Sequence, residues 1–379
     1  YDRKKDKVYQ TEGISINNPR RIKDIIKLIK RLNDNENINY IGLDYIRPAG
    51  GGLELVDDFI SSMNIDLPGG WDNYTKKERM SWLGRVVTRS KDRDIPIINK
   101  WNWWRAHRVS KIIKQIRREV KLKKPLWLFV LSWELGHQHG QDPIMFQDAG
   151  ADLIAVMMYQ ANAVQFNYFV NKWKEYVQGR KINILSGNQF DWPLHQYSVM
   201  PSGPEEYQRR LIESIECLEP TGNFKGIFIH DFSRALWGRR GPYSTKEWLM
   251  AAAEGFSRLD SEKNKLKVSL ILPPSAESGK FIEGQIRIKN RSDDEILNLR
   301  LSLEAADELG LPFKEKEIKS IKPGAEFIEN FKVGVEGLAG QHLGRYMVAA
   351  RVREDEQIYT ATDYLWIKNI DPDRYIKFR

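Results

Sequence analysis

The sequence predicts an α/β protein in which a parallel (β/α) barrel is followed by a β-sandwich. Three observations predict this architecture. Apolar strand-like runs alternate with amphipathic helices over residues 1–260, as expected for parallel strands covered by helices. Several of these runs end on polar or aromatic side chains, as in barrels whose catalytic groups stand at the carboxyl ends of the strands. From residue 265 onward, apolar and polar residues alternate, which is typical of short antiparallel strands.

The expected elements of the first domain follow in chain order. Asn18 and Pro19 open the first helix, because asparagine caps a helix start and proline has no amide hydrogen to lose there. After strand 39–46 comes an insertion rich in glycine and aromatic residues, in which Thr75 and Glu78 predict a capping box. The further expected elements are helix 104–122, strand 126–133, a helical piece from Pro143 to Gly150, strand 152–159, helix 164–177, strand 182–187, a helix opening at Gly203-Pro204, strand 226–231 and helix 245–256.

Five strong strands are visible in this domain, whereas a closed (β/α)8 or TIM barrel needs eight. Residues 8–16 and 95–99 could add two weak strands. We therefore expect a barrel that is either incomplete at its amino end or atypical. In the first case a preceding segment or a partner chain would complete it.

The second domain is expected at residues 265–370, after a polar and charged linker at 260–264. Its alternating runs are separated by turn residues such as Pro273-Pro274 and Lys322-Pro323-Gly324. Short strands at this spacing predict an immunoglobulin-like β-sandwich. Residues 1–260 form the predicted barrel domain.

The net charge of +9 belongs to the first 260 residues, since basic and acidic residues balance from residue 261 onward. Nucleic acid, an anionic glycan or cell surface, and plain solubility are three readings of such a charge. Many of the basic residues lie on the polar faces of amphipathic helices, and no groove-reading motif accompanies them. We expect no nucleic-acid partner.

The chain contains no run of the ~20 apolar residues that a membrane helix needs, and no signal-peptide pattern at Tyr1. The absence of an initiator methionine suggests a processed or trimmed chain. Cys217 is the single cysteine, so an intrachain disulfide is impossible.

The run Ile41 to Pro48, Ile-Gly-Leu-Asp-Tyr-Ile-Arg-Pro, resembles a strand of the glycosyl-hydrolase-like family 10 proteins and related bacterial glycoside hydrolases. Pieces that look similar follow in the same order at Trp104-Arg105, Lys124-Pro125, Ala151-Asp152 and Gly226-Ile227. The resemblance spans roughly residues 14–256. It implies a TIM barrel whose first three strands are absent here, glycosidase activity, and an extracellular or cell-surface location.

Glycoside hydrolysis needs two carboxyl groups at one bond, one ionised and one kept protonated by apolar surroundings. Asp44 and Glu134 each follow an apolar strand, and the resemblance implies that these strands are neighbours. Asp44 beside Tyr45 and Arg47 suits a nucleophile or base, whereas Glu134 beside Trp133 suits the acid. Structural roles, a buried hydrogen-bonded carboxylate for Asp44 and an exposed loop residue for Glu134, are the alternatives.

Asp231 is a reserve candidate for the second carboxylate, with a cap or turn role as its alternative. Asp191 beside Trp192 is a third option. Aromatic rings stack on sugar faces, and polar side chains at strand ends can hold hydroxyl groups. The residues expected to bind substrate are Tyr45, Arg47, Trp103, Trp104, Trp133, His137, Tyr159, Asn188, Trp192 and His230. Core packing is the alternative for about half of the tryptophans.

His137, His139 and Asp142 have a spacing that could bind a metal, but a lone His-x-His is weak evidence, and we expect no metal and no cofactor. The sequence therefore predicts a glycoside hydrolase acting on a polysaccharide or oligosaccharide. The alternative is a non-catalytic glycan-binding or structural assembly protein built on the same barrel.

Overall fold

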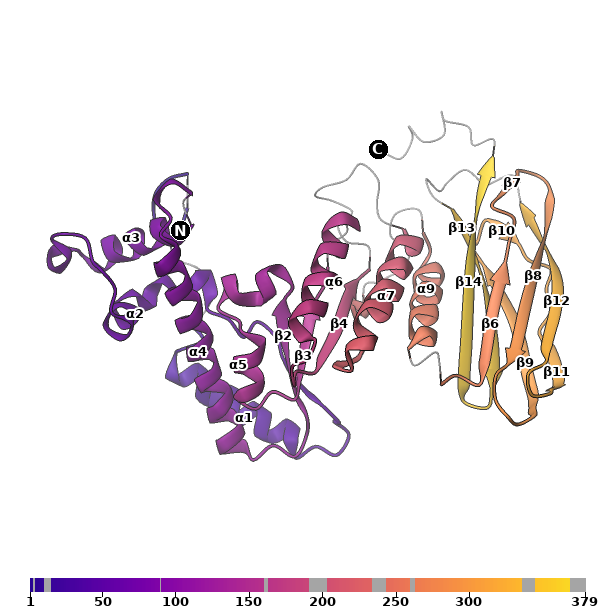
Figure 1. Ribbon diagram of the computed structural model, residues 1–379, viewed down its shortest axis with the longest axis horizontal. Helices are drawn as coiled ribbons and strands as arrows, with labels where there is room; N and C mark the ends of the chain where they lie inside the picture. Colours follow the sequence, from indigo (N-terminus) through magenta and orange to yellow (C-terminus); the bar gives the residue numbers. More distant parts are fainter. Residues whose placement is uncertain are drawn as a thin grey trace. The chain divides into compact units, whose positions relative to one another are not determined.

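A computed structural model describes residues 1–2, 4–9, 15–88, 90–159, 163–190, 203–233, 243–259, 263–335 and 345–368 of the 379-residue chain. The chain divides into two compact units. The first contains residues 1–158, 168–186 and 221–225, and the second contains residues 159–167, 187–220 and 226–379. Each unit is described by itself (Figure 1).

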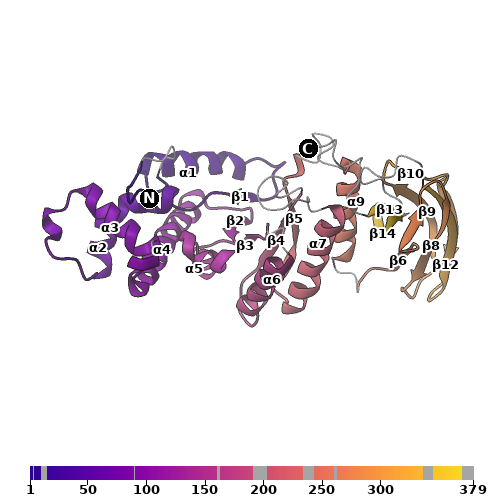
Figure 2. The same ribbon diagram turned by 90° about the horizontal axis from the view of Figure 1, so that it is seen from above.

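Five parallel strands form a sheet in the unbroken order β1-β2-β3-β4-β5, which the labels in Figure 2 follow. Within the first unit, Leu43 pairs with Leu128, and Leu128 pairs with Ile154. The strands are β1 (Ile41–Leu43), β2 (Leu126–Leu131), β3 (Leu153–Met157), β4 (Ile184–Gln189) and β5 (Phe224–His230). All five strong strands predicted from the apolar runs are confirmed.

The described residues show no closed barrel, because this parallel sheet contains five strands rather than eight. The expected weak strand at 95–99 is wrong. Asp94 accepts a hydrogen bond from the Ile97 amide and caps a helix, and Pro96 lies in its first turn. Of the other expected weak strand, residues 10–14 lie outside the described residues, and Val8, Tyr9, Ser15 and Ile16 are not in a strand.

Amphipathic helices cover this sheet. Helix α1 (Pro19–Asn33) begins as predicted, with the Asn18 side chain accepting from the amides of Arg20 and Arg21. Helix α4 (Ile95–Val120) starts nine residues before the expected position and buries Ile113 and Ile116. Helices α5 (Pro143–Asp148) and α6 (Ala163–Val177) follow β2 and β3.

The insertion after β1 folds around a core of its own. It contains η1 (Ala49–Leu55), α2 (Val56–Met63), η2 (Trp71–Asn73), α3 (Lys76–Thr88) and η3 (Ser90–Asp92). Phe59 is fully buried against Trp101 and Trp104 of α4. The predicted capping box is present, since Thr75 donates its amide hydrogen to Glu78 Oε2 and Thr75 Oγ1 accepts from the Glu78 amide.

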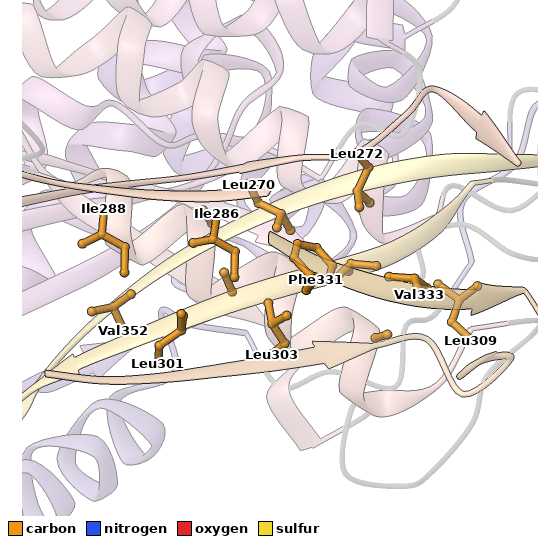
Figure 3. Close-up of a cluster of buried hydrophobic side chains, with 14 of the residues drawn as sticks. Leu270, Leu272, Ile286, Ile288, Leu301, Leu303, Leu309, Phe331, Val333 and Val352 are labelled. Carbon is orange, nitrogen blue, oxygen red and sulfur yellow. The ribbon is translucent and has the colours of Figure 1, made fainter. Parts of the chain in front are cut away.

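The second unit contains a β-sandwich, as predicted. One sheet has the order β10-β12-β8-β6 and the other β11-β9-β13-β14-β7. Figure 3 shows Ile286 and Phe331 of the first sheet near Leu301 and Val352 of the second. The strands are β6 (Leu266–Ile271), β7 (Ser275–Glu277), β8 (Phe281–Asn290), β9 (Ile296–Ala305), β10 (Leu309–Gly310), β11 (Lys316–Ile321), β12 (Glu326–Val335), β13 (Tyr346–Glu354) and β14 (Gln357–Lys368).

Two helices pack with the sandwich in this unit, α7 (Pro204–Leu218) and α9 (Thr245–Arg258), and η5 (Glu219–Thr221) follows α7. The buried carboxylate of Glu254 in α9 accepts hydrogen bonds from the amide (2.5 Å) and the hydroxyl (2.6 Å) of Thr362 in β14. Met250 of α9 lies in one apolar cluster with Met347 and Tyr364. Hydrogen bonds and apolar contacts therefore join α9 to one sheet of the sandwich.

Among the helices of the described ranges, none combines the length and the hydrophobicity needed to cross a membrane.

Candidate functional site

The first group of candidate residues follows strands β1 and β2. These strands are hydrogen-bonded neighbours and run parallel, so their carboxyl ends lie at the same edge of the sheet. Asp44 comes directly after β1, and Glu134 comes three residues after the end of β2. Both side chains are exposed. The structure thus places the two predicted carboxylates after neighbouring strand ends, in contact with solvent.

The loop after β1 presents an aromatic ring and a cation. The Asp44 carboxylate accepts a hydrogen bond from the Tyr45 amide (2.6 Å). Tyr45 has a left-handed backbone (φ +51°), and 66% of its surface is exposed. The half-buried Arg47 lies with its guanidinium carbon 5.1 Å from the centre of the Tyr45 ring. The ring and the guanidinium therefore stack on each other beside Asp44.

The loop after β2 contains η4 (Trp133–His139) and carries three consecutive residues with left-handed backbones. Their φ angles are +43° at Glu134, +55° at Leu135 and +80° at Gly136. Left-handed conformations of non-glycine residues are costly and concentrate at functional sites. Gln141 holds this loop, because its amide group bonds both Phe129 O and the Leu131 amide at the end of β2.

Trp133 supplies an exposed aromatic surface beside Glu134. Its ring packs edge-on against the ring of Phe169, with 4.5 Å between the ring centres, and 45% of the Trp133 surface is exposed. The neighbouring Ser132 is buried, and its carbonyl accepts a hydrogen bond from the Trp173 indole (3.1 Å). The hydrogen bond from Trp173 therefore holds the backbone at Ser132, whereas the ring of Trp133 is accessible to solvent.

Arg105 of α4 connects the two loops. Its guanidinium donates to Gly51 O (3.0 Å) in the segment after β1 and to Gln138 O (2.8 Å) in the loop after β2. A further hydrogen bond reaches Asn102 Oδ1. The side chain is buried, and no carboxylate of the described ranges forms an ion pair with it. Burial lowers the pKa of Arg105 to about 10, so it is a charged group with no counter-ion in the part of the chain that the structure describes.

His139 lies in the positive field of two arginines. Burial lowers its pKa to about 4, and the charges of Arg47 and Arg105 act in the same direction. The imidazole is therefore neutral at physiological pH. Gly140 follows His139 and has a left-handed backbone (φ +67°). A Cβ atom at this residue would lie only 2.7 Å from Arg105 Cβ, so the loop is in close contact with the arginine.

The Nε2 atom of His137 lies 3.5 Å from Asp142 Oδ2. Asp142 also caps α5 by accepting from the Met145 amide (2.9 Å). No group of three or more His, Cys, Asp or Glu side chains within the described ranges is arranged to hold a metal ion.

A second group of predicted residues belongs to the other unit. Tyr159 stacks on His230, with 4.8 Å between ring centres and 12° between planes. Asn188 is fully buried, and neither atom of its amide group meets a hydrogen-bond partner among the described residues. Asp231 accepts from the amide of Ser233 (3.0 Å), which matches the turn role weighed for it.

The remaining tryptophans have other surroundings. Trp104 is 4% exposed and stacks on Trp101, with 5.5 Å between the ring centres. Trp104 therefore belongs to the core of the insertion and offers no surface to a substrate. Trp103 is exposed on α4 and stacks on His107. Asp191 and Trp192 lie outside the described residues.

Arg105 and His139 are not among the residues expected from the sequence to catalyse or to bind substrate. A signal for Arg105 was available, because it precedes Val109 by four residues and therefore continues the apolar stripe formed by Val109, Ile112, Ile113 and Ile116. An arginine on the buried face of a helix indicates a specific set of hydrogen-bond acceptors. His139 had been weighed only as part of a metal motif.

Comparisons with known proteins identify no family. No family model matches the chain, and no curated protein does. Similar solved structures include the CARDB domain of PF1109 from Pyrococcus furiosus (17% identity, 27% of this chain, 94% of that chain, TM-score 0.22). They also include the FixG-related protein from Vibrio parahaemolyticus (10% identity, 28% of this chain, 99% of that chain, TM-score 0.23). Another is the alpha-2-macroglobulin of E. coli (16% identity, 27% of this chain, 7% of that chain, TM-score 0.24).

These findings correct the resemblance drawn from the strand at Ile41 to Pro48. That strand does exist, but no model of a glycosyl-hydrolase-like family matches the chain, and none of these neighbours is described as a glycoside hydrolase. Short apolar strands that end on Asp and Tyr recur in many parallel sheets, so this pattern was not specific enough to assign the chain to a family.

Proposed function

We propose that the chain is a glycoside hydrolase that acts on a polysaccharide through Asp44 and Glu134. One observation carries this proposal. Strands β1 and β2 pair in parallel, so Asp44 and Glu134 follow neighbouring strand ends at the same edge of the sheet. The exposed aromatic residues Tyr45 and Trp133 are their neighbours in the sequence. Two carboxylates with flanking aromatic rings suit the cleavage of a bond between sugars.

The roles of the two carboxylates follow from their neighbours. Asp44 accepts a hydrogen bond from the Tyr45 amide, and Arg47, which stacks on Tyr45, belongs to the same loop; an exposed carboxylate in such surroundings suits a nucleophile or base. Glu134 is the candidate acid. Its left-handed backbone in a loop held by Gln141 would fix the direction in which it meets the glycosidic oxygen.

The strand order supports the prediction of a (β/α)8-type barrel. Parallel strands that follow one another without a reversal place their right-handed crossovers on one face of the sheet, as in a (β/α)8-type barrel. The two antiparallel sheets with one shared apolar core are compatible with an immunoglobulin-like sandwich. An extracellular or cell-surface location would suit a polysaccharide substrate.

A non-catalytic glycan-binding protein is the second candidate, and one observation favours it. A catalytic acid is kept protonated by apolar surroundings, whereas Glu134 is exposed. Exposed aromatic rings alone are sufficient to bind sugars without cleaving them.

The release of reducing ends from a panel of polysaccharides tests the proposal. Hydrolysis by the wild type should fall by about 10³-fold or more in both Asp44→Asn and Glu134→Gln, as expected for the loss of a nucleophile or an acid. The matched control is Asp24→Asn, at an exposed position of α1, which should keep full activity. Binding without release from any glycan would support the non-catalytic candidate instead.

A further inference from the structure

The loops of the candidate site lie near two arginines that hydrolysis alone does not require. Arg47 and Arg105 both act on the imidazole of His139 and lower its pKa. Both charged groups that lower this pKa are arginines, so the local field around the imidazole is positive although Asp44 and Glu134 belong to the same loops.

The two arginines have different tasks. Arg105 is buried, and its guanidinium donates hydrogen bonds to the carbonyl oxygens of Gly51 and Gln138 and to the side chain of Asn102. It therefore fixes the loops and contributes charge. Arg47 is half-buried and stacks on Tyr45. Within the described ranges, no hydrogen bond or ion pair engages its guanidinium, so all its donors are available to a ligand.

A stacked guanidinium with free donors suits an anion that offers two oxygen acceptors. Its planar fork forms two parallel hydrogen bonds to a carboxylate, and the ring of Tyr45 holds it in place at a low cost in side-chain entropy. Arg105, which also acts on His139, favours an anion nearby, because a buried cation without a counter-ion is costly. Neutral His139 can donate one further hydrogen bond.

We propose that the substrate is an acidic polysaccharide and that Arg47 binds the carboxylate of a uronic acid residue in it, next to the exposed rings of Tyr45 and Trp133. This inference rests on the proposed function, because it names the substrate class of the same site. The net charge of +9 in residues 1–260 is compatible with such a substrate, since a positive field attracts a polyanion.

Binding titrations at physiological salt test this proposal. The probes are oligomers of glucuronic, galacturonic and mannuronic acid, each compared with its carboxyl-reduced, neutral counterpart. At least one acidic oligomer should bind the wild type about tenfold more tightly than its neutral counterpart, which is the equivalent of one charge-assisted hydrogen-bond pair. Arg47→Gln should abolish this preference, and Arg47→Lys, which keeps the charge but loses the fork, should retain part of it.

Lys27→Gln is the matched control, since it removes one positive charge from an exposed position of α1 and should leave the preference unchanged. Equal affinity for acidic and neutral oligomers would overturn the inference, even if neutral glycans are bound and cleaved as the proposed function requires. Tight binding of acidic oligomers without cleavage would support the inference and count against hydrolysis.

Two further binding titrations, with sulfated oligosaccharides and with single-stranded DNA, determine which kind of anion the site binds. Preference confined to sulfated oligosaccharides over their desulfated forms would overturn the carboxylate assignment. Equal binding of single-stranded oligodeoxythymidylate, weakening steeply with salt, would show a nucleic-acid site and overturn the glycan assignment.

Discussion

The guanidinium of Arg105 donates a hydrogen bond to the carbonyl oxygen of Gln138 at 2.8 Å. A second bond from the same guanidinium reaches Gly51 O. Because Gly51 follows β1 and Gln138 follows β2, a single side chain of α4 determines how the two loops of the candidate site lie. The position of Asp44, Tyr45 and Arg47 relative to η4 therefore depends on a residue that has no direct role in binding.

Replacing Arg105 should destabilise the first unit. Arg105→Gln removes the charged donor of the hydrogen bonds to Gly51 O, Gln138 O and Asn102 Oδ1, and a hydrogen bond to a charged group contributes about 1.5–3 kcal/mol. We expect the free energy of unfolding to fall by roughly 2–4 kcal/mol, measured by urea titration with tryptophan fluorescence. The control Arg118→Gln removes an exposed arginine of the same helix and should change little. An equal effect of both substitutions would contradict the role given to Arg105.

The imidazole of His139 should titrate far below an ordinary histidine. Its pKa is about 4 in the folded chain, against about 6.5 when unfolded. The unfolded chain therefore binds more protons between these values, so His139 makes the folded state less stable as the pH falls from 6.5 towards 4. NMR titration of the imidazole should give a midpoint near 4, and a bound uronate oligomer should raise it. A midpoint between 6 and 7 in the free protein would show that neither burial nor the two arginines act on this imidazole as described.

The loop after β2 should not tolerate a side chain at residue 136. Gly136 has φ +80°, and a Cβ atom there would lie 2.5 Å from Val130 Cγ1. Gly70 has a similar φ of +75° with open space around it. Gly70→Ala should therefore cost only the strain of the left-handed backbone, about 1–2 kcal/mol, whereas Gly136→Ala should cost at least ~2 kcal/mol more and weaken glycan binding. Thermal unfolding of the two variants measures the difference, and similar losses would show that the loop has room to relax.

The buried carboxylate of Glu254 should stabilise the second unit. In Glu254→Ala, the Thr362 amide loses its acceptor and Arg258 loses its partner. We expect a loss of about 2–3 kcal/mol and faster hydrogen exchange at the Thr362 amide. Glu283→Ala, which removes an exposed glutamate of β8, is the control. Unchanged exchange at Thr362 would mean that β14 does not depend on α9.

Much of the fold could be predicted from the sequence, because local patterns determine it. Apolar runs identified all five strong parallel strands, and Asn18 and Thr75 marked helix starts through hydrogen bonds that form within one turn. The strand expected at 95–99 failed because the apolar run Ile95-Pro96-Ile97-Ile98 is too short to distinguish a strand from a helix. The cap at Asp94 and the proline in the first turn were the better evidence.

The site was harder to predict, since its geometry depends on contacts between distant residues. Nothing in the local sequence indicates that Glu134 and Leu135 adopt left-handed backbones, although the side chain of Gln141, which bonds to the end of β2, lies only a few residues further along the chain. The burial of Trp104 likewise depends on Phe59 in a helix 45 residues away in the sequence. Exposed tryptophans and core tryptophans have the same local pattern, so only packing separates Trp133 from Trp104.

The most direct measurement is a crystal structure of the Asp44→Asn variant with a bound uronate oligosaccharide. We predict that the sugar lies along the rings of Tyr45 and Trp133, with a glycosidic bond between residues 44 and 134 and a carboxylate on Arg47. An oligosaccharide bound elsewhere, or no binding of any glycan to the first unit, would contradict the proposal that the ends of β1 and β2 form a carbohydrate site.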